Sequence, residues 1–324
     1  MSSESKLTVL VVGAGGNTGF LIATALLDAN KYNTYILCRP GSQDKTRIVT
    51  LKARGAKVKL GDIINDTVEE LEKNLIGVDV VVSAVSTSSM DGEKTLFQAA
   101  KNAGVQRVVP SDFGFMVPPG EILLSDMKRK LHSFIEELGV GYTFIEVGWW
   151  MDLVLPYPSN TTGILAQRSY TAGGTGKVKV AFTPRIDIGR FVAHIIADPR
   201  TLNQTVFCYS DQLTLDEVYD IANRVSGEDL RSKVTMWTKA QLAKQIEDAR
   251  VAYEQAPSVM TIVGRVVPEC YYYMYVRGHN TVEKAKELGA LDARALYPDF
   301  QPLSTEEYAK LFYKELPDIF YSNV

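Results

Sequence analysis

A cluster of glycines near the start of the chain stands between a short apolar segment, Leu7 to Val12, and an apolar helical pattern, Phe20 to Leu27. Backbone without a Cβ atom lets a pyrophosphate group approach, and the free amides and positive dipole end of a helix N-terminus stabilise its charge. A strand, a glycine-rich turn and a helix in this order therefore predict a dinucleotide-binding loop. The residues that we expect to bind the dinucleotide here are Gly13, Gly16, Asn17, Thr18 and Gly19.

The end of the second predicted strand indicates which dinucleotide binds. An Asp or Glu at this place would bind the ribose hydroxyls of NAD. The chain has Cys38-Arg39-Pro40 there, and Ser42, Lys45 and Arg47 follow in the same predicted loop. The Arg39 guanidinium can form a forked pair with a 2′-phosphate. The sequence therefore predicts NADPH as the cofactor, bound in part by Arg39, Ser42 and Lys45.

These loops need a scaffold, and strand-like and helical segments alternate through the first half of the chain. The segments typical of strands are 7–12, 35–38, 57–60, 78–85, 107–110 and 142–147. Helical segments lie between them, around 67–73, 92–103 and 126–138. Repeated β-α-β units with short loops form a parallel, doubly wound sheet, because right-handed crossovers place helices on both faces. We therefore predict an α/β chain with a Rossmann-type doubly wound parallel sheet.

After Trp150 the pattern changes, because residues 151–183 contain prolines and glycines and have no helical period. A helix at 187–197 and a strand at 205–209, which could return to the main sheet, come next. Thr214 and Glu217 form a capping box before another helix. We therefore expect a dinucleotide-binding domain, 1–150 plus 184–210, and a smaller, discontinuous substrate-binding lobe, 151–183 plus 211–324.

Composition excludes several other classes of protein. Hydrophobic residues make up 46% of the chain, charged residues 23%, and the formal net charge is -3. This profile is typical of an ordinary globule and gives no basic surface for nucleic acid or membrane. The three cysteines are far apart, so we expect neither a disulfide framework nor a bound metal, and we expect a reducing, cytoplasmic location. The partner that we expect is a small-molecule substrate, for a monomer or homodimer.

The catalytic group does not follow from the usual motifs. None of the sixteen tyrosines has a lysine four residues later, so the Tyr-x-x-x-Lys pair of extended short-chain dehydrogenases is missing. The histidines, His132, His194 and His279, fit no Ser-His-Asp or Cys-His arrangement. The basic run 127–130 contains Lys128 and Lys130, and by itself such a run indicates a solvated face.

Several motifs together resemble the NmrA-like, isoflavone-reductase-like family of atypical short-chain dehydrogenases. Besides the glycine loop they are Ser83-Ala84-Val85, Pro110-Ser111-Asp112-Phe113-Gly114 and Asp198-Pro199-Arg200-Thr201-Leu202-Asn203. The last two runs are much more specific than the glycine loop, which is common to many folds, and the likeness covers nearly the whole chain.

The resemblance implies roles for further residues. In the family's plant reductases one lysine replaces Tyr-x-x-x-Lys and handles the proton while NADPH delivers hydride. Counting back from the strand at Tyr142-Thr143-Phe144 places Lys128 at this position. The resemblance also places Asp62 near the adenine, Phe113 near the nicotinamide and three residues along the cofactor's far ribose, namely Ser83, Ala84 and Val85.

The chain departs from the plant members where substrate would lie, because Glu146 to Trp150 replace a Ser-Asn-x-Phe sequence. Trp149, Trp150, Met151 and Tyr272 could form an aromatic pocket for a flat substrate, or could pack between the lobes. The sequence thus favours an NADPH-dependent reductase of a small aromatic metabolite. Two alternatives stay open: a regulator of the NmrA kind that senses the dinucleotide without turnover, and an enzyme that rearranges or cyclises its substrate without net redox change.

Overall fold

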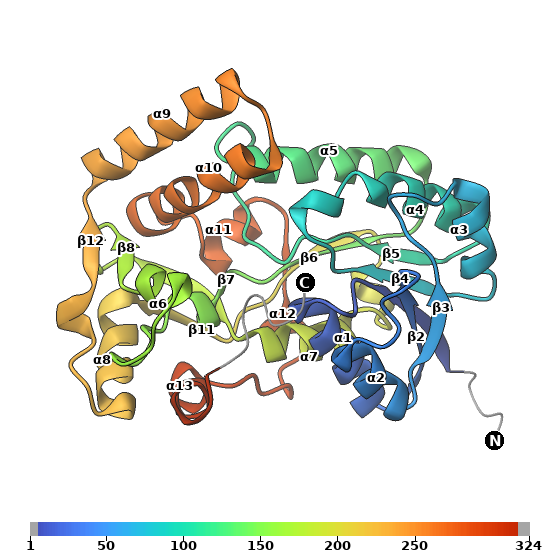
Figure 1. Cartoon of the computed structure of the whole chain (residues 1–324), viewed down its shortest axis with the longest axis horizontal. Helices are drawn as coiled ribbons and strands as arrows, with labels where there is room; N and C mark the ends of the chain where they lie inside the picture. The colour runs from blue at the N-terminus through green and yellow to red at the C-terminus, as the bar shows by residue number, and fades with distance from the viewer. Residues whose placement is uncertain (1–5, 317–324) are drawn as a thin grey trace.

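Parallel strands joined by helices form the first half of the chain in the computed structural model, which describes residues 6–316 (Figure 1). A five-stranded sheet has the order β3-β2-β1-β4-β5, and every pair in it is parallel. Its strands are β1 (Leu7–Val12), β2 (Tyr32–Cys38), β3 (Lys57–Leu60), β4 (Val80–Ser83) and β5 (Arg107–Val109). The strand order reverses between β1 and β4, which is the place where ligands bind in open α/β sheets. The predicted fold class is confirmed.

A second parallel sheet continues the first one. It has the order β13-β10-β6, with β6 at Thr143–Glu146, β10 at Gln204–Phe207 and β13 at Leu291–Asp292. A parallel bridge between Val108 and Tyr142 joins it to β5. The strand predicted near residue 205 therefore does return to the main sheet. The chain returns to this sheet a second time at β13, which lies within residues 211–324, the range predicted for the lobe.

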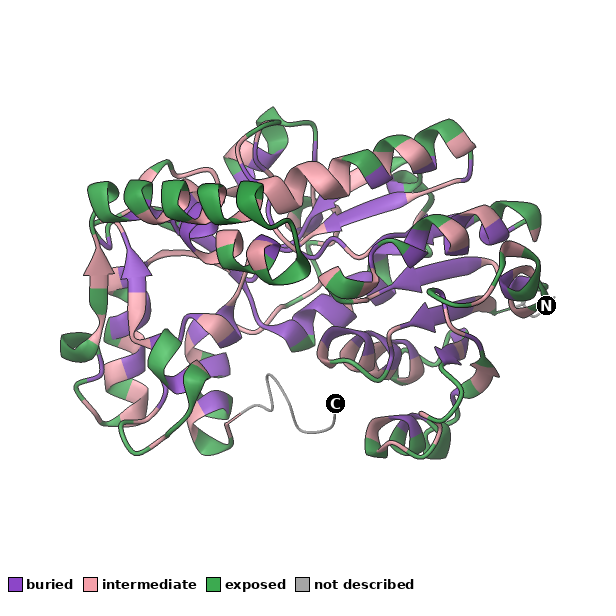
Figure 2. Ribbon diagram, turned by 45° about the horizontal axis from the view of Figure 1, so that its top comes forward, coloured by how far each residue is buried: buried purple, intermediate pink, exposed green. Residues whose placement is uncertain are grey.

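Helices cover both faces of the sheet, and the alternation of side chains along β1 explains why. Val9 and Val11 pack with α1 (Asn17–Asp28), α2 (Thr46–Ala53) and α7 (Arg185–Ile195). Leu10 and Val12 pack on the opposite face with α3 (Val68–Leu75), α4 (Gly92–Asn102) and α5 (Leu123–Leu138). Successive strand residues point to opposite faces, so an unbroken apolar strand needs a helix layer on each side. Figure 2 shows the inner strands between these layers as mostly buried.

The remaining residues form a lobe with its own core, on the left of Figure 1. Its strands make two small sheets, β11-β9-β7 and β12-β8. They are β7 (Trp149–Trp150), β8 (Thr171–Gly173), β9 (Lys179–Thr183), β11 (Asp211–Thr214) and β12 (Thr235–Trp237). Its helices are α6 (Ile164–Ser169), α8 (Leu215–Ser226), α9 (Lys239–Gln255), α10 (Val259–Tyr271), α11 (Val282–Glu287) and α13 (Thr305–Lys314), and α12 (Ala293–Leu296) follows β13. We propose the division into two parts that the sequence predicted, with β13 added to the large sheet.

Some elements differ from the prediction. The helix α2 was not predicted, and the stretch 151–183 holds a short helix and two short strands that have too few residues to show a period. The capping box of Thr214 and Glu217 is present as predicted. Among residues 6–316, no helix combines the length and the apolar character that a membrane span needs.

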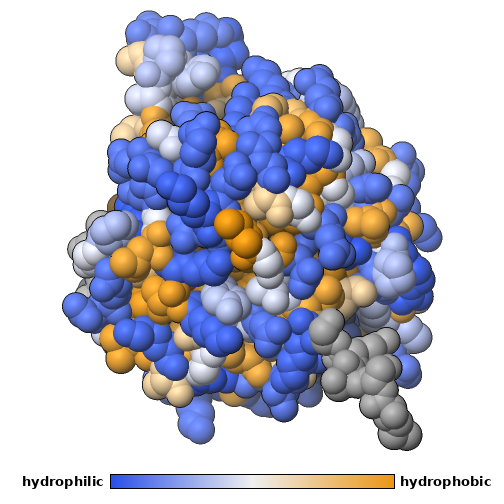
Figure 3. Space-filling model, turned by 90° about the vertical axis from the view of Figure 1, so that its right-hand side faces the viewer, coloured by the Kyte–Doolittle hydropathy of each residue, from blue (hydrophilic) through white to orange (hydrophobic). Residues whose placement is uncertain are grey.

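The outer edge of the large sheet is protected by charge. β3 is the edge strand, and it carries Lys57 and Lys59 in only four residues. Short edge strands with lysines disfavour pairing with the edge of another sheet. The side of the molecule that carries β3, seen in Figure 3, is mostly hydrophilic with scattered apolar residues.

A buried ion pair ties the lobe to the large domain. Both carboxylate oxygens of Asp152, which is 3% exposed, accept from Arg185: Oδ2 from the backbone N–H at 3.1 Å and Oδ1 from Nε at 3.1 Å. The hydroxyl of Tyr308, on α13, donates to Oδ1 at 2.7 Å. Arg185 begins α7, so one carboxylate connects three separate segments of the chain.

We expect Asp152→Asn to lower the free energy of unfolding by about 3–5 kcal/mol, because it leaves the Arg185 guanidinium buried without its counter-charge. Urea unfolding followed by circular dichroism measures this change. Lys244→Ala, which removes the exposed Lys244–Asp248 pair on α9, is the matched control and should change stability little. Equal stability of Asp152→Asn and the wild type would contradict the assignment.

Candidate active site

The predicted cofactor residues meet at one edge of the sheet. The glycine loop follows β1, Arg39 follows β2, Asp62 follows β3, the segment 83–85 ends β4, and Phe113 follows β5. Because these strands are parallel, their carboxyl ends lie at the same edge. These residues therefore lie at a common edge, and the contacts of each residue with a cofactor stay predictions.

The glycines of the loop have two different structural roles, and the first is close packing. Gly13 has φ +83°, and a Cβ atom on it would lie 2.4 Å from the carbonyl oxygen of Ala84. A Cβ atom on Gly19 would lie 2.3 Å from the carbonyl oxygen of Gly13. These two glycines therefore let the loop, α1 and β4 pack against one another.

Gly15 and Gly16 are instead exposed and less closely packed. A Cβ atom on Gly16 would meet only the Gly13 carbonyl oxygen, at 3.2 Å, and one on Gly15 only the Ile48 side chain, at 3.8 Å. Gly16 is the N-cap of α1 and supplies no side-chain cap to its amides. An exposed, side-chain-free backbone at a helix N-terminus fits a pyrophosphate group. The prediction had left out Gly15, although its residue type was a signal for it.

Positive side chains surround the end of β2. Arg39 is exposed, and its carbonyl oxygen accepts from the Ser42 N–H at 3.0 Å. Lys45 is the N-cap of α2. Arg47 lies on α2 and not in a loop, and its guanidinium donates to the Gly15 carbonyl oxygen at 3.3 Å. The helix α2 therefore connects the predicted 2′-phosphate site to the glycine loop.

Asp62 has local partners. Its carboxylate accepts from the Ile64 N–H at 3.0 Å and from the Asn65 amide at 2.8 Å, and so organises the turn after β3. Across the edge, the Ser111 hydroxyl donates to the Val85 carbonyl oxygen at 2.9 Å. This bond joins the segments that follow β4 and β5.

The segment after β5, residues 110–114, has an unusual backbone. Phe113 is buried and has φ +43°, a left-handed conformation that is costly for a bulky residue. Its N–H donates to the Ile145 carbonyl oxygen at 3.0 Å, and its carbonyl oxygen accepts from the Trp150 indole at 2.9 Å. Such strain persists where the surroundings over-determine it and is common at active sites.

Two carboxylates, a buried one and a half-buried one, hold the same segment from different elements. Glu93, on α4, accepts from the Ser111 N–H at 2.9 Å, and Glu146, at the end of β6, accepts from the Gly114 N–H at 3.1 Å. Burial raises the pKa of Glu93 to about 7, against the opposite effects of the Ser83 hydroxyl and the Ser111 amide. Burial also raises the pKa of Glu146, and the Asp112 carboxylate adds to this. Sequence reasoning did not predict Glu93 as part of the site, and it named Glu146 only as a departure from the plant pattern where substrate would lie.

Lys128 is half-buried on α5, and its ammonium donates to the carbonyl oxygen of Asp112. Lys130 is exposed, so the two lysines of the basic run have different environments. The start of α5 is anchored to the lobe, because the Leu123 N–H donates to Glu269 of α10 at 3.1 Å. Lys128 is thereby held at the same edge as the glycine loop.

His132 lies one turn after Lys128 and faces the same residue. Its Nε2 is 3.0 and 2.9 Å from the two carboxylate oxygens of Asp112. The side chains of His132 and Asp112 are 18% and 1% exposed. The sequence had suggested no catalytic arrangement for this histidine, because Asp112 is distant in the chain.

The four predicted substrate residues lie in different surroundings. Met151 is fully buried in the core of the lobe. The Trp150 indole N–H donates a hydrogen bond to the Phe113 carbonyl oxygen in the 110–114 segment. Trp149 is half-buried, with ring centroids 6.3 Å from Phe115 and 6.4 Å from Tyr271 in edge-to-face geometry. Tyr272, also half-buried, begins a π-helical turn, a feature that is frequent at functional sites. Contact of these side chains with substrate stays a prediction.

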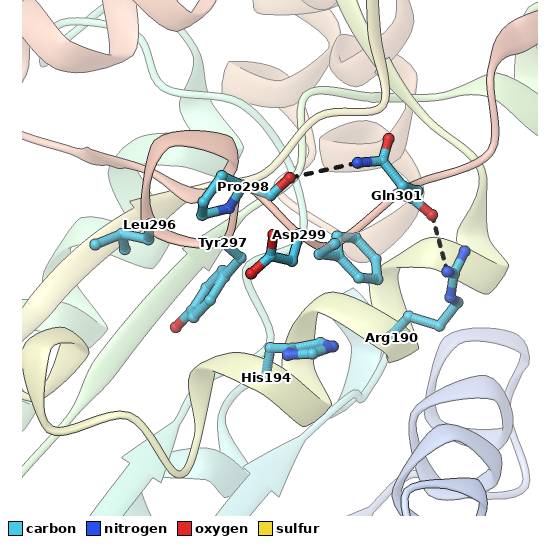
Figure 4. A pocket seen from close by; sticks show the side chains of 8 residues that line it. Arg190, His194, Leu296, Tyr297, Pro298, Asp299 and Gln301 are labelled. Atoms are coloured by element: carbon cyan, nitrogen blue, oxygen red, sulfur yellow. Dashed lines mark hydrogen bonds between the residues drawn. The ribbon is translucent and has the colours of Figure 1, made fainter.

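A surface pocket of about 530 Å³ lies elsewhere (Figure 4). It is lined by Arg190 and His194 of α7 and by the segment 296–301. The hydroxyl of Tyr32, the first residue of β2, donates to the Ala193 carbonyl oxygen, so this end of α7 lies at the amino ends of the strands. The pocket is therefore at the opposite edge and does not belong to the candidate active site.

Comparisons with known proteins cover nearly the whole chain. A family model described as the NmrA-like family matches residues 5–309. Asnovolin J 5′,6′-dehydrogenase nvfM of Aspergillus novofumigatus is 35% identical, over 96% of this chain and 96% of its own. Phenylcoumaran benzylic ether reductase Pyrc5 of Pyrus communis is 28% identical, over 95% and 99%. Among solved structures, the binary complex of leucoanthocyanidin reductase with NADPH from Vitis vinifera has a TM-score of 0.77 at 26% identity, covering 95% of this chain and 100% of that one.

The different surroundings of the glycines lead to a test. We expect Gly16→Val to weaken NADPH binding at least tenfold, or ~1.4 kcal/mol, with a nearly native fold, because the new side chain fills the open cradle. Gly19→Ala should instead lower the melting temperature, because its Cβ atom collides with the backbone of Gly13. Fluorescence titration with NADPH and thermal unfolding measure both effects. Normal NADPH binding by a folded Gly16→Val protein would show that the loop does not hold the cofactor.

Proposed function

The chain belongs to the NmrA-like family, and we propose that it is an isoflavone-reductase-like NADPH oxidoreductase of a small aromatic metabolite. The reaction takes place at a conjugated C=C bond, an imine-like bond or a benzylic position, and Lys128 handles the proton. The observation that carries this proposal is the place of Lys128, which lies half-buried beside the segment after β5, at the edge where the glycine loop ends β1.

The residues at this edge have separate tasks. Bound NADPH supplies the hydride. The backbone of Gly15 and Gly16 holds the pyrophosphate, and Arg39 pairs with the 2′-phosphate. The Lys128 ammonium gives a proton to the substrate atom that becomes more basic during reduction, and Asp112 holds that ammonium in place through its carbonyl oxygen. The half-buried rings of Trp149 and Tyr272 give a flat substrate an apolar surface.

The relatives' names bear on substrate and direction. One relative is named a benzylic ether reductase and another a dehydrogenase, so the scaffold is associated with both directions of redox chemistry. Glu146, Trp149 and Trp150 stand where the plant substrates would lie, and these residues differ from the plant pattern. We therefore infer an aromatic substrate other than those of the plant enzymes, and an assay needs both NADPH with unsaturated candidates and NADP⁺ with saturated ones. The cytoplasmic location and a monomeric or homodimeric state stay predictions.

Cofactor choice can be tested through Arg39. We expect NADPH to bind roughly ten- to a hundredfold more tightly than NADH, because one forked pair with the 2′-phosphate contributes about 1.5–3 kcal/mol. Arg39→Ala should lose most of this preference and leave NADH affinity nearly unchanged. Titration of both cofactors by fluorescence gives the four affinities. Equal affinities in the wild type would overturn the assignment of Arg39.

The role of Lys128 can be tested with a matched pair of variants. Lys128→Met keeps the apolar stem and removes the ammonium, so turnover should fall by ~10²–10⁴-fold, as for the loss of a general acid–base group. NADPH affinity should change little. Lys130→Met, on an exposed position two residues later, should be nearly silent and controls for a general charge effect. Turnover is followed by absorbance at 340 nm with a panel of aromatic metabolites.

The possible results separate the candidate functions. Normal turnover in Lys128→Met would contradict the lysine mechanism. If the wild type binds NADPH tightly but no metabolite of the panel leads to NADPH oxidation, the result would favour the dinucleotide-sensing regulator. Conversion of a metabolite at constant absorbance would favour the rearranging or cyclising enzyme.

A further inference from the structure

Asp112 is held from two sides by residues of one helix. Its backbone carbonyl oxygen accepts from the Lys128 ammonium, and both oxygens of its carboxylate face Nε2 of His132. Lys128 and His132 are four residues apart on α5, so they lie on the same face of the helix. One residue of the strained segment after β5 therefore connects the lysine to the histidine.

The His132 ring has a fixed orientation. It stacks on Phe144 of β6 with centroids 3.7 Å apart and an interplanar angle of 10°. Phe144 in turn stacks on Tyr142 at 4.4 Å and 16°. Since Nε2 faces a carboxylate, it carries a proton both in the neutral ring and in the cation. Titration of His132 therefore changes the charge opposite Asp112 without removing the hydrogen bond.

Acidic groups surround this ring from several elements. Asp112 contacts it from the segment after β5, Glu146 faces it from β6, and Glu93 of α4 lies next to Asp112. Lys128 is the positive group nearby. Burial opposes a charged ring, but Asp112 and then Glu146 outweigh burial and Lys128, so the pKa of His132 is raised. Burial raises the pKa of Glu93 and of Glu146 to about 7, and the protonation of Glu146 is coupled to the charge of His132.

We propose that His132 is a positioning residue that, in its charged form, fixes Asp112 and through it the direction of the Lys128 ammonium. The proposal rests on the proposed role of Lys128 in proton transfer. Charged His132 neutralises the enclosed Asp112 carboxylate and holds the peptide carbonyl in place for the lysine. Neutral His132 leaves a buried carboxylate that lacks its counter-charge, and the segment loosens.

The sign of the pH effect follows from the raised pKa. The positioning is complete at pH values below the pKa of a free imidazole and is lost as the pH rises through the raised pKa of His132. Turnover should decline across that interval. His132→Arg, which places a permanent positive charge there, should abolish the decline. His132→Gln, which leaves only a neutral hydrogen-bond donor, should make turnover low at every pH.

Two variants and a control test this on the full chain with bound NADPH. Nitrogen-15 NMR of lysine side chains reports on an ordered ammonium without any substrate, and Lys128→Met identifies the signal. We expect the Lys128 signal of the wild type to broaden as the pH rises through the His132 titration. In His132→Arg the signal should stay sharp over that interval, and in His132→Gln it should be broad from the start. His194→Gln, at the opposite edge of the sheet, should behave as the wild type does.

Turnover gives the second readout, on the aromatic metabolite that the panel identifies. His132→Gln should lower kcat about tenfold, as expected when a hydrogen bond to a charged group is weakened, with little change in the Kd of NADPH. The kcat of His132→Arg should show no decline in the interval in which the wild type declines. A Lys128 signal that does not respond to pH or to His132→Gln would overturn the positioning role, even if Lys128→Met abolishes turnover. Normal turnover in Lys128→Met would overturn the proposed function instead, whatever the NMR result.

Discussion

The left-handed peptide at Phe113 is the constraint on which the site depends. A bulky residue adopts this strained backbone only where its surroundings hold it there. Here hydrogen bonds to both the N–H and the carbonyl oxygen of Phe113 hold it in that conformation. The bend turns the Asp112 carbonyl oxygen toward α5 and the Asp112 carboxylate toward His132. Loss of the bend would separate Lys128 from the strand ends that hold the glycine loop.

The bonds that enforce this bend come from distant parts of the chain. Glu93 belongs to α4, Glu146 to β6, and Trp150 to the first strand of the lobe. The helix α5 is itself fixed at its start by Glu269 of α10. Packing of the lobe against the large domain therefore reaches the catalytic edge through hydrogen bonds as well as through apolar contacts. Changes in the lobe can in this way affect the lysine.

Local sequence patterns predicted what depends on the backbone. The strand, glycine and helix pattern was sufficient for the cofactor edge, because a parallel sheet brings every strand end to one side. The spacing of Lys128, Leu131 and Ile135 also held a signal that the prediction did not use. These three residues share one face of the helix, and Leu131 and Ile135 on that face are buried. Lys130 lies on a different face. The pairing of His132 with Asp112 depends on tertiary contact, so no spacing in the sequence could have indicated it. The short elements between 151 and 183 have too few residues to show a period.

The division between backbone and side chains explains how one scaffold serves different substrates. Backbone at Gly15 and Gly16 forms the cradle that fits a pyrophosphate, so this part of the site tolerates few changes of residue type. The proposed substrate side is instead formed by side chains such as those of Trp149 and Tyr272, which lie outside β1 and α1. Glu146 is constrained from another direction, because it also accepts from the Gly114 N–H. If Glu146 also borders the substrate, as its place at the end of β6 and shortly before Trp149 allows, it would link specificity to catalysis. Burial and Asp112 raise the pKa of its carboxyl to about 7, and Lys128 and His132 of α5 act in the opposite direction, so the charge of this group depends on the helix that carries the proposed proton donor.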